Sequence, residues 1–244
     1  MSKDKVRHSK YFVLSPEEVR IMLNHSVGRD NFVIASLTFG GIREGELVHM
    51  QDNWIHINDS AAEKFKVNHI TIPAMGNICD CDDCTRQAYF EFMRGKTKRT
   101  SNWYPKMQKK YYALKQADDL PDLGEIRWSP KSESGARIIP ILFPEYKTAV
   151  QSYFKDNKSV DITRQTVWRI VKRVGKTSFG EERTIYPHVI RATCATLWAG
   201  TGMDPYDLTT LMGWKSIKSA EPYIQADVKK MITTVKSKKD LWMK

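Results

Sequence analysis

The stretch that organises this chain runs Pro187-His188-Val189-Ile190-Arg191, then Leu211-Met212-Gly213-Trp214, and ends at Tyr223. His188 and Arg191 are three residues apart, so they share one face of a helix. Pro187 suits the first helical position, because the N–H that it lacks would have had no intrahelical partner. A second helix is predicted to open with Asp204 as N-cap and Pro205 in its first position, and to close near Gly213.

These residue types favour chemistry on a phosphate group. A histidine and an arginine on one helical face can grip phosphate oxygens, and a guanidinium does so through a planar fork. Trp214 adds an indole N–H donor. Tyr223 supplies a phenol that becomes a nucleophile once it loses its proton. The stretch therefore predicts a phosphoryl-transfer site.

The same spacing carries a family resemblance. His188-x-x-Arg191, Gly213-Trp214 and Tyr223 resemble the C-terminal signature of the tyrosine recombinases, the phage-integrase family. Upstream, residues 39–47 resemble the segment of the family's first arginine, and residues 130–140 resemble its β-hairpin lysine segment. The four segments occur in the family's order, and the resemblance covers roughly residues 14–235.

The resemblance implies a role for each matched residue. Tyr223 would attack a DNA phosphodiester, and Arg43 and Arg191 would clamp its non-bridging oxygens. Lys131 would protonate the leaving 5′ oxygen, while His188 would accept the tyrosine proton or donate to the phosphate. Trp214 stands where the family often carries histidine. Glu46, in an R-x-x-E relation to Arg43, would orient that arginine or a neighbouring base; a surface carboxylate is the alternative.

The expected function is site-specific DNA recombination or integration through a 3′-phosphotyrosine intermediate. The bond energy stays in that intermediate, so the enzyme would need neither ATP nor a metal ion. Two alternatives stay open: a type IB topoisomerase-like enzyme that relaxes DNA, and a DNA-binding protein whose site is unused. The expected partner is double-stranded DNA with attachment-type sites, bound by a homotetramer that is a monomer when free.

Composition agrees with a polyanionic partner. The 244-residue chain has a formal net charge of +11, which favours nucleic acid, although a merely basic soluble protein is the alternative. No apolar run approaches the roughly 20 residues needed to cross a bilayer. Four cysteines, three of them crowded together, argue against a disulfide framework and for a reducing compartment. We therefore expect a cytoplasmic protein that is located with the genome, has no membrane partner and is encoded by a virus or plasmid.

The predicted fold is mainly α with a small antiparallel β-sheet (α+β), the fold of a tyrosine recombinase catalytic domain. Residues 1–13 form a basic arm, residues 14–225 the catalytic domain, and residues 226–244 an amphipathic tail helix that docks on a neighbouring protomer or on its own domain. The short arm leaves open whether the chain is a catalytic fragment or a natural minimal form. Strands at 126–128 and 136–141 are predicted to form a β-hairpin with Lys131 near its tip.

Residues 77–120 form the least family-like segment, an insertion rich in lysines and aromatic residues. Basic residues interleaved with aromatics suit a nucleic-acid-facing surface, and an amphipathic helix with a solvated basic face is the equal alternative.

Three cysteines open this insertion. Cys79, Cys81 and Cys84 have near-ligand spacing for a structural Zn²⁺, with His69 or a nearby carboxylate as fourth ligand. Such clusters resemble those of some archaeal-type integrases. Free thiols in an acidic loop are the alternative. Cys194 is expected in the core.

Overall fold

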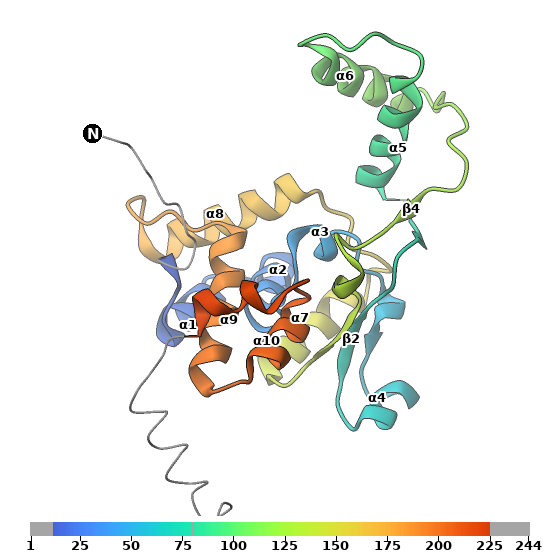
Figure 1. The fold of residues 1–244 in the computed structure, drawn as a ribbon. Helices are drawn as coiled ribbons and strands as arrows, with labels where there is room; N and C mark the ends of the chain where they lie inside the picture. Colours follow the sequence, from blue (N-terminus) through green and yellow to red (C-terminus); the bar gives the residue numbers. More distant parts are fainter. Residues whose placement is uncertain (1–11, 80, 225–244) are drawn as a thin grey trace, which may run out of the picture.

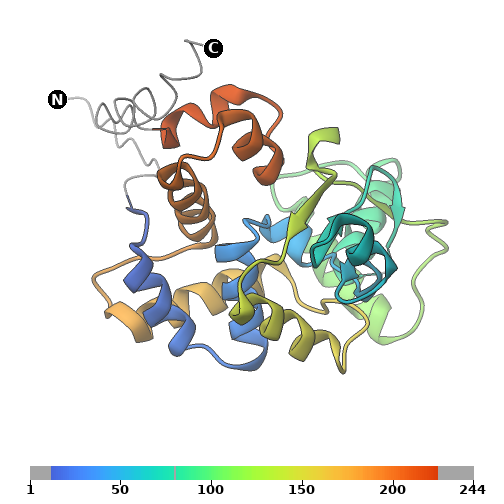
Figure 2. The ribbon, with the colours of Figure 1, turned by 90° about the horizontal axis from the view of Figure 1, so that it is seen from below.

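A helical bundle around one apolar helix forms the main body. The computed structural model describes residues 12–79 and 81–224. Its central helix, α2 (Gly28–Phe39), buries every residue from Phe32 to Thr38, so its sides are covered by other elements. The helices that pack on α2 are α1 (Pro16–Asn24), α7 (Pro144–Phe154), α8 (Arg164–Phe179) and α9 (Pro187–Thr201). Figures 1 and 2 show this bundle from two directions.

Local capping signals set where these helices begin. The Ser15 hydroxyl accepts a hydrogen bond from the Glu18 backbone N–H at 3.2 Å, and the Glu18 carboxylate accepts one from the Ser15 N–H at 2.8 Å. This is the capping box that the sequence predicts. Thr163 caps α8 in a similar way, through the Thr166 N–H at 3.2 Å.

The C-terminal part follows the predicted pattern closely. Helix α9 begins at Pro187 and α10 (Pro205–Met212) at Pro205, with Asp204 as N-cap. Gly213 ends α10 in the left-handed region, at φ +60°. Two 3-10 turns follow, η4 (Ile217–Ser219) and η5 (Glu221–Tyr223), so Tyr223 lies on a short turn after Pro222.

Two small antiparallel sheets flank the bundle. The larger has the order β1-β2-β5, formed by β1 (Ile55–His56), β2 (His69–Ile72) and β5 (Arg137–Pro140). The smaller pairs β3 (Asn77–Ile78) with β4 (Arg127–Trp128). The remaining elements of this part are α3 (Glu44–Leu47), η2 (Asp52–Trp54), α4 (Ser60–Phe65) and η3 (Glu133–Gly135). The prediction of a mainly α protein with small antiparallel sheets is confirmed.

The predicted β-hairpin around Lys131 is wrong. Strand β4 pairs with β3, and β5 pairs with β2, so the two expected hairpin strands lie in different sheets. Each of the two strands pairs with a strand that is distant in the sequence. Ile139 of β5 is paired with Ile70 of β2, and Trp128 of β4 is paired with Asn77 of β3. Lys131 therefore lies in a loop between the two sheets.

The insertion folds into a projecting helical pair. Helices α5 (Asp82–Arg94) and α6 (Trp103–Gln116) pack on each other and stand away from the bundle, joined to it through β3 and β4 (Figure 1). Their facing sides form a separate apolar cluster of Tyr89, Met93, Trp103, Met107 and Tyr111. Most of the aromatic residues in the predicted DNA-facing surface thus serve as a local core, which leaves the lysines outside.

Some predictions fall outside the described residues. These are residues 1–11 of the predicted arm at 1–13 and the tail helix at 226–244. Among the helices of the described ranges, none has the length and apolarity that crossing a bilayer requires.

Candidate active site

One cavity of about 780 Å³ gathers side chains from distant parts of the sequence. Its wall includes five of the predicted active-site residues, Arg43, Lys131, His188, Arg191 and Trp214. They come from the start of α3, the loop after β4, the first turns of α9 and the turn after α10. The fold thus brings four separate sequence segments to one place.

The sixth predicted residue lies directly behind this wall. Tyr223 is not among the residues that line the cavity, but its ring stacks on Trp214, with centroids 5.3 Å apart and planes at 15°. Tyr223 therefore packs against a residue of the cavity wall. Tyr223 packs with the apolar cluster of α9 and α10 that contains Cys194 and Met212. Cys194 is buried in this core, as predicted.

Glu46 holds the arginines of the site together. Its carboxylate is 2% exposed and accepts hydrogen bonds from Arg43 Nη1 at 2.5 Å and from Arg137 at 2.9 and 3.0 Å. Burial alone would raise the pKa of Glu46, but Arg137, Arg191 and Arg43 together lower it to about 2. The carboxylate is therefore ionised at neutral pH and is not a surface group.

Arg137 is the residue that sequence reasoning missed. Its side chain is 2% exposed, and its guanidinium also donates to the Leu211 and Gly135 carbonyls, each at 2.8 Å. The strand pattern could have indicated its burial, because Arg137 and Ile139 are two residues apart and share the buried face of β5. An arginine on the inward face of a strand needs a buried acidic partner.

Backbone carbonyls fix Arg43 and Arg191, two of the arginines that line the cavity. Arg43 Nη2 donates to the Gly213 carbonyl at 2.5 Å, and Arg191 donates to the carbonyls of Gly41 and Met212. Burial lowers the pKa of Arg191 to about 9, although the nearby Glu46 carboxylate acts to raise this pKa. The guanidinium is therefore protonated at neutral pH. Each guanidinium has five N–H donors, which leaves donors for a ligand in the cavity.

Because Gly213 has no side chain, Arg137 and the Ser134 carbonyl can lie close to the turn after α10. A Cβ atom at this position would lie 2.7 Å from Arg137 Nη1 and 3.1 Å from the Ser134 carbonyl oxygen. Its φ of +60° is also in the region that favours glycine. Any side chain at position 213 would displace Arg137, which explains why this position of the Gly213-Trp214 pair is a glycine.

The balance of charge in the cavity is positive. Arg164 and Lys215 lie in the wall beside Arg43, Lys131 and Arg191, while Glu44 and Glu46 are the carboxylates there. Since Glu46 is ion-paired with Arg137 and Arg43, and Arg164 with Asp83, the net positive charge of the cavity comes from Lys131, Arg191 and Lys215. Such a site suits an anionic group such as a phosphodiester.

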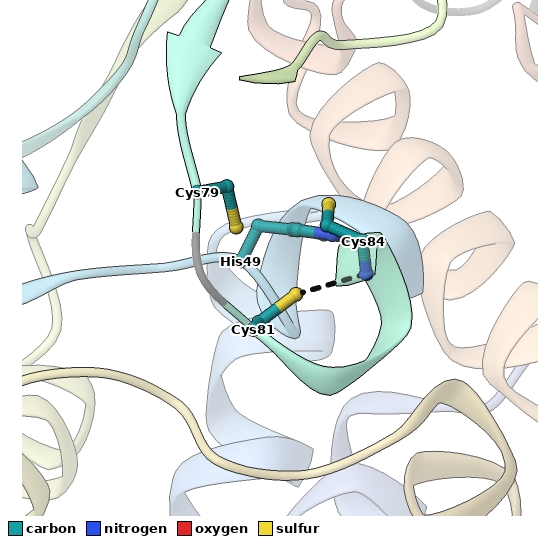
Figure 3. A group of neighbouring side chains, drawn as sticks. All are labelled: His49, Cys79, Cys81 and Cys84. Carbon is teal, nitrogen blue, oxygen red and sulfur yellow. Dashed lines mark hydrogen bonds between the residues drawn. The ribbon is translucent and has the colours of Figure 1, made fainter. Parts of the chain in front are cut away.

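The cysteines of the insertion come together, with a different histidine from the one predicted. Cys79, Cys81, Cys84 and His49 offer ligand atoms that all lie within 4.8 Å of one another (Figure 3). The assignment of His69 as fourth ligand is wrong: its Nδ1 is 3.0 Å from the Val67 carbonyl oxygen, and its ring packs on His56 and Phe65. His69 is the first residue of β2, in the larger sheet, and its contacts are with residues of that part of the protein.

Comparison with known proteins gives similarity in both sequence and fold. Residues 127–230 match the phage integrase family. The chain is 31% identical over 96 residues to the tyrosine recombinase XerA of Saccharolobus solfataricus, a match that covers 38% of this chain and 32% of XerA. The matched region is thus about a third of that relative's length.

Solved structures extend the likeness to almost the whole chain. The fold resembles a Tn1549 transposon integrase in complex with a circular intermediate DNA, with a TM-score of 0.59, 16% identity and coverage of 97% of this chain and 68% of the integrase. It also resembles the XerA recombinase crystal structure, with a TM-score of 0.53, 16% identity and coverage of 92% and 62%. At these identities the likeness concerns the fold.

Proposed function

We propose that this chain, a tyrosine recombinase catalytic domain in sequence and fold, cleaves and rejoins DNA strands as a site-specific recombinase or integrase. One observation carries the proposal. Arg43, Lys131, His188, Arg191 and Trp214 converge on a single cationic cavity, and Tyr223 stacks against its wall. These six residues come from several separate segments of the sequence, so their convergence supports a common function.

Double-stranded DNA is the proposed substrate. The net charge of +11 favours a polyanion, and the cations of the cavity suit a phosphodiester. The Tn1549 integrase of similar fold was solved with DNA. We propose that the assembled form on DNA is a homotetramer.

In the proposed reaction, the Tyr223 hydroxyl attacks the scissile phosphorus and forms a 3′-phosphotyrosine bond. The bond from phosphorus to the 5′ oxygen breaks, and that oxygen leaves with a proton. Arg43 and Arg191 stabilise the charge on the non-bridging oxygens, and the carbonyls that hold them set their orientation in advance. For the attack, the Tyr223 hydroxyl must reach a phosphate in the cavity, whose wall in this structure includes Trp214 but not Tyr223.

Two residues of the cavity are suited to proton transfer. Lys131, on the exposed loop between the sheets, carries a proton that can pass to the leaving 5′ oxygen. His188 is exposed on the first turn of α9, and an imidazole has one nitrogen that can accept the Tyr223 proton and one N–H that can donate to the phosphate. Rejoining reverses these transfers, and the proposed chemistry uses no metal ion and no ATP.

A nicked suicide substrate tests this function. A DNA duplex with a nick just downstream of the scissile phosphate loses its short 5′-hydroxyl fragment on cleavage, which traps the protein on the labelled strand. We expect a covalent band on a denaturing gel with the wild type and none with Tyr223→Phe. Tyr206→Phe is the matched control, because Tyr206 is 71% exposed on α10, outside the cavity wall.

A second assay separates the two DNA-cleaving functions. Recombination between two attachment-type sites requires exchange of strands between duplexes, whereas a topoisomerase-like enzyme relaxes a supercoiled plasmid that carries no such site. Covalent trapping with site-dependent strand exchange supports the recombinase. Relaxation of any plasmid without exchange would assign the chain to the topoisomerase-like alternative.

A further inference from the structure

The histidine of the cysteine cluster is oriented as a metal ligand. His49 Nδ1 lies 2.5 Å from the Gly45 carbonyl oxygen. Because a carbonyl only accepts, Nδ1 carries the ring proton, which leaves the lone pair on Nε2. That Nε2 lies 3.1 Å from Cys84 Sγ, inside the cluster. A backbone carbonyl that fixes the tautomer in this way is the usual outer-shell partner of a metal-binding histidine.

The surroundings hold the ring in place. Trp128 of β4 stacks on His49, with ring centroids 4.9 Å apart and planes at 19°. His49 is 4% exposed, Cys79 5% and Cys84 7%. Three of the four donor residues are thus buried, and Cys81 is partly exposed. A mostly closed set of four protein ligands is typical of a structural site and not of a catalytic one with an open position.

The dimensions fit a small tetrahedral ion. Bond lengths of about 2.3 Å to sulfur and about 2.0 Å to nitrogen place neighbouring ligands of Zn²⁺ roughly 3.5–3.8 Å apart. The four ligand atoms lie within 4.8 Å of one another, so a contraction of about 1 Å completes the site. A donor set of one imidazole and three thiols is typical of structural Zn²⁺.

We propose that His49, Cys79, Cys81 and Cys84 bind one structural Zn²⁺, and that the ion fastens the α5–α6 insertion to α3. The cysteines open the insertion: Cys79 follows β3, Cys81 caps α5, and Cys84 lies in its first turn. His49 comes from the chain that leaves α3. The ion would cross-link two segments about thirty residues apart in sequence.

This link ends close to the proposed active site. Arg43 is the N-cap of α3, and Gly45, which accepts the His49 hydrogen bond, lies in the cavity wall. A second contact runs beside it, since Arg164 Nε is 3.8 Å from the Asp83 carboxylate of α5, and its guanidinium packs on Gly45. The ion therefore fixes the turn that presents Arg43. This consequence rests on the proposed recombinase function, whereas metal binding does not.

Metal content measured without DNA tests the site directly. We expect about one zinc per chain in protein purified under reducing conditions without chelator, because closed four-ligand sites bind zinc tightly. Replacement by Co²⁺ should give the intense visible absorption of a tetrahedral site and charge-transfer bands from thiolate. Zinc-reconstituted wild type that holds well under one ion per chain would overturn the proposal.

Matched variants identify the ligands. In His49→Asn the amide can still donate to the Gly45 carbonyl, but the Nε2 ligand is lost. Loss of an outer-shell partner alone typically costs about 10–100-fold in metal affinity, so His49→Asn and Cys84→Ser should each lose more than about 100-fold. His69→Asn and Cys194→Ser are the controls, and both should keep the wild-type cobalt spectrum. If His49→Asn also keeps that spectrum, His49 is not a ligand and the proposed site is wrong.

The link to α3 has its own readout. Removal of zinc with a chelator should increase amide hydrogen exchange in residues 44–49 and 82–94, and restoring zinc should reverse the increase. Unchanged exchange at 44–49 in protein shown to have lost its zinc would overturn the fastening role. Because none of these measurements uses DNA, their result is independent of whether the chain cleaves DNA.

Discussion

Glu46 determines how the arginines of the cavity are arranged. It binds Arg137, which is 2% exposed and has no access to a ligand, and Arg43, which is 22% exposed and lines the cavity. The buried pair with Arg137 fixes the carboxylate, and the carboxylate then orients Arg43. Breaking one side of a buried ion pair leaves an uncompensated charge, which costs about 3–5 kcal/mol.

The pKa of Glu46 gives a pH prediction. Its folded-state value of about 2 lies below the ordinary 4.5, so its ionised form stabilises the fold above pH 4.5, and this contribution is lost as the pH falls toward 2. At about 1.4 kcal/mol per unit, the contribution is about 3 kcal/mol. Urea denaturation from pH 7 to pH 3 should show a steeper loss of stability in the wild type than in Glu46→Gln.

The control for this measurement is Glu44→Gln, two residues before Glu46 on α3. It should follow the wild-type pH dependence. An equal acid limb in the wild type and Glu46→Gln would show that Glu46 is not the titrating group.

A second residue-level prediction concerns Lys131. If it protonates the leaving 5′ oxygen, Lys131→Ala should slow cleavage of ordinary DNA by about 10²–10⁴-fold, the usual contribution of a general acid. A substrate with sulfur at the 5′-bridging position should recover most of the rate, because a thiolate leaves without a proton. Single-turnover cleavage rates on both substrates measure this. Equal losses on the two substrates would assign Lys131 to phosphate binding instead.

At the scale of elements, the sequence predicts what local signals decide. Helix α1 begins directly after the capping residue Ser15, α9 begins at Pro187, and α10 begins directly after the capping residue Asp204. Each start is thus set by a residue at or next to it. The hairpin prediction failed because strand pairing depends on partners far along the chain. Strand β4 pairs with residues 77–78, and β5 pairs with residues 69–72. The sequence around Lys131 does not indicate either of these partners.

The same limit explains the candidate sites. Motif spacing identified the three cysteines and five active-site candidates of the cavity wall, because each signature lies within a short segment. The fourth metal-site residue, His49, lies thirty residues before Cys79, and only the fold brings the two together. Arg137 was within reach of the strand pattern, whereas the position of Tyr223 behind Trp214 was not.

The α5–α6 pair should unfold separately from the bundle. Trp103 is 3% exposed in the pair's own apolar cluster, and loss of a large buried aromatic side chain typically costs about 3–5 kcal/mol. In Trp103→Ala we therefore expect faster amide hydrogen exchange in residues 82–116 and unchanged exchange in α2 and α9. A matched loss of protection in α2 would show that the insertion and the bundle unfold as one unit.

At the scale of the whole molecule, the exposed lysines of α6 are expected to contribute to DNA affinity. Each phosphate contact adds about 0.9 to the slope of log affinity against log salt concentration. Changing Lys106, Lys109 and Lys110 to glutamine together should therefore lower that slope by about 3 in fluorescence-anisotropy titrations. All three are exposed, while the neighbouring Trp103, Met107 and Tyr111 face inward.

The control pair is Lys64→Gln with Lys66→Gln on and just after α4, which Figure 1 shows at the opposite end of the molecule from α6. It should leave the slope unchanged. If the α6 triple variant also leaves it unchanged, the basic face of the insertion is only solvated.

The central claim is that Tyr223 forms the covalent bond to DNA, and one measurement tests it most directly. The adduct trapped on a suicide substrate is digested with nuclease and protease, and the modified peptide is sequenced by mass spectrometry. We predict a nucleotide joined through its 3′ phosphate to the Tyr223 oxygen, in the peptide that follows Lys218. A nucleotide on any other residue, such as Tyr206, or an adduct that persists in Tyr223→Phe, would contradict the account.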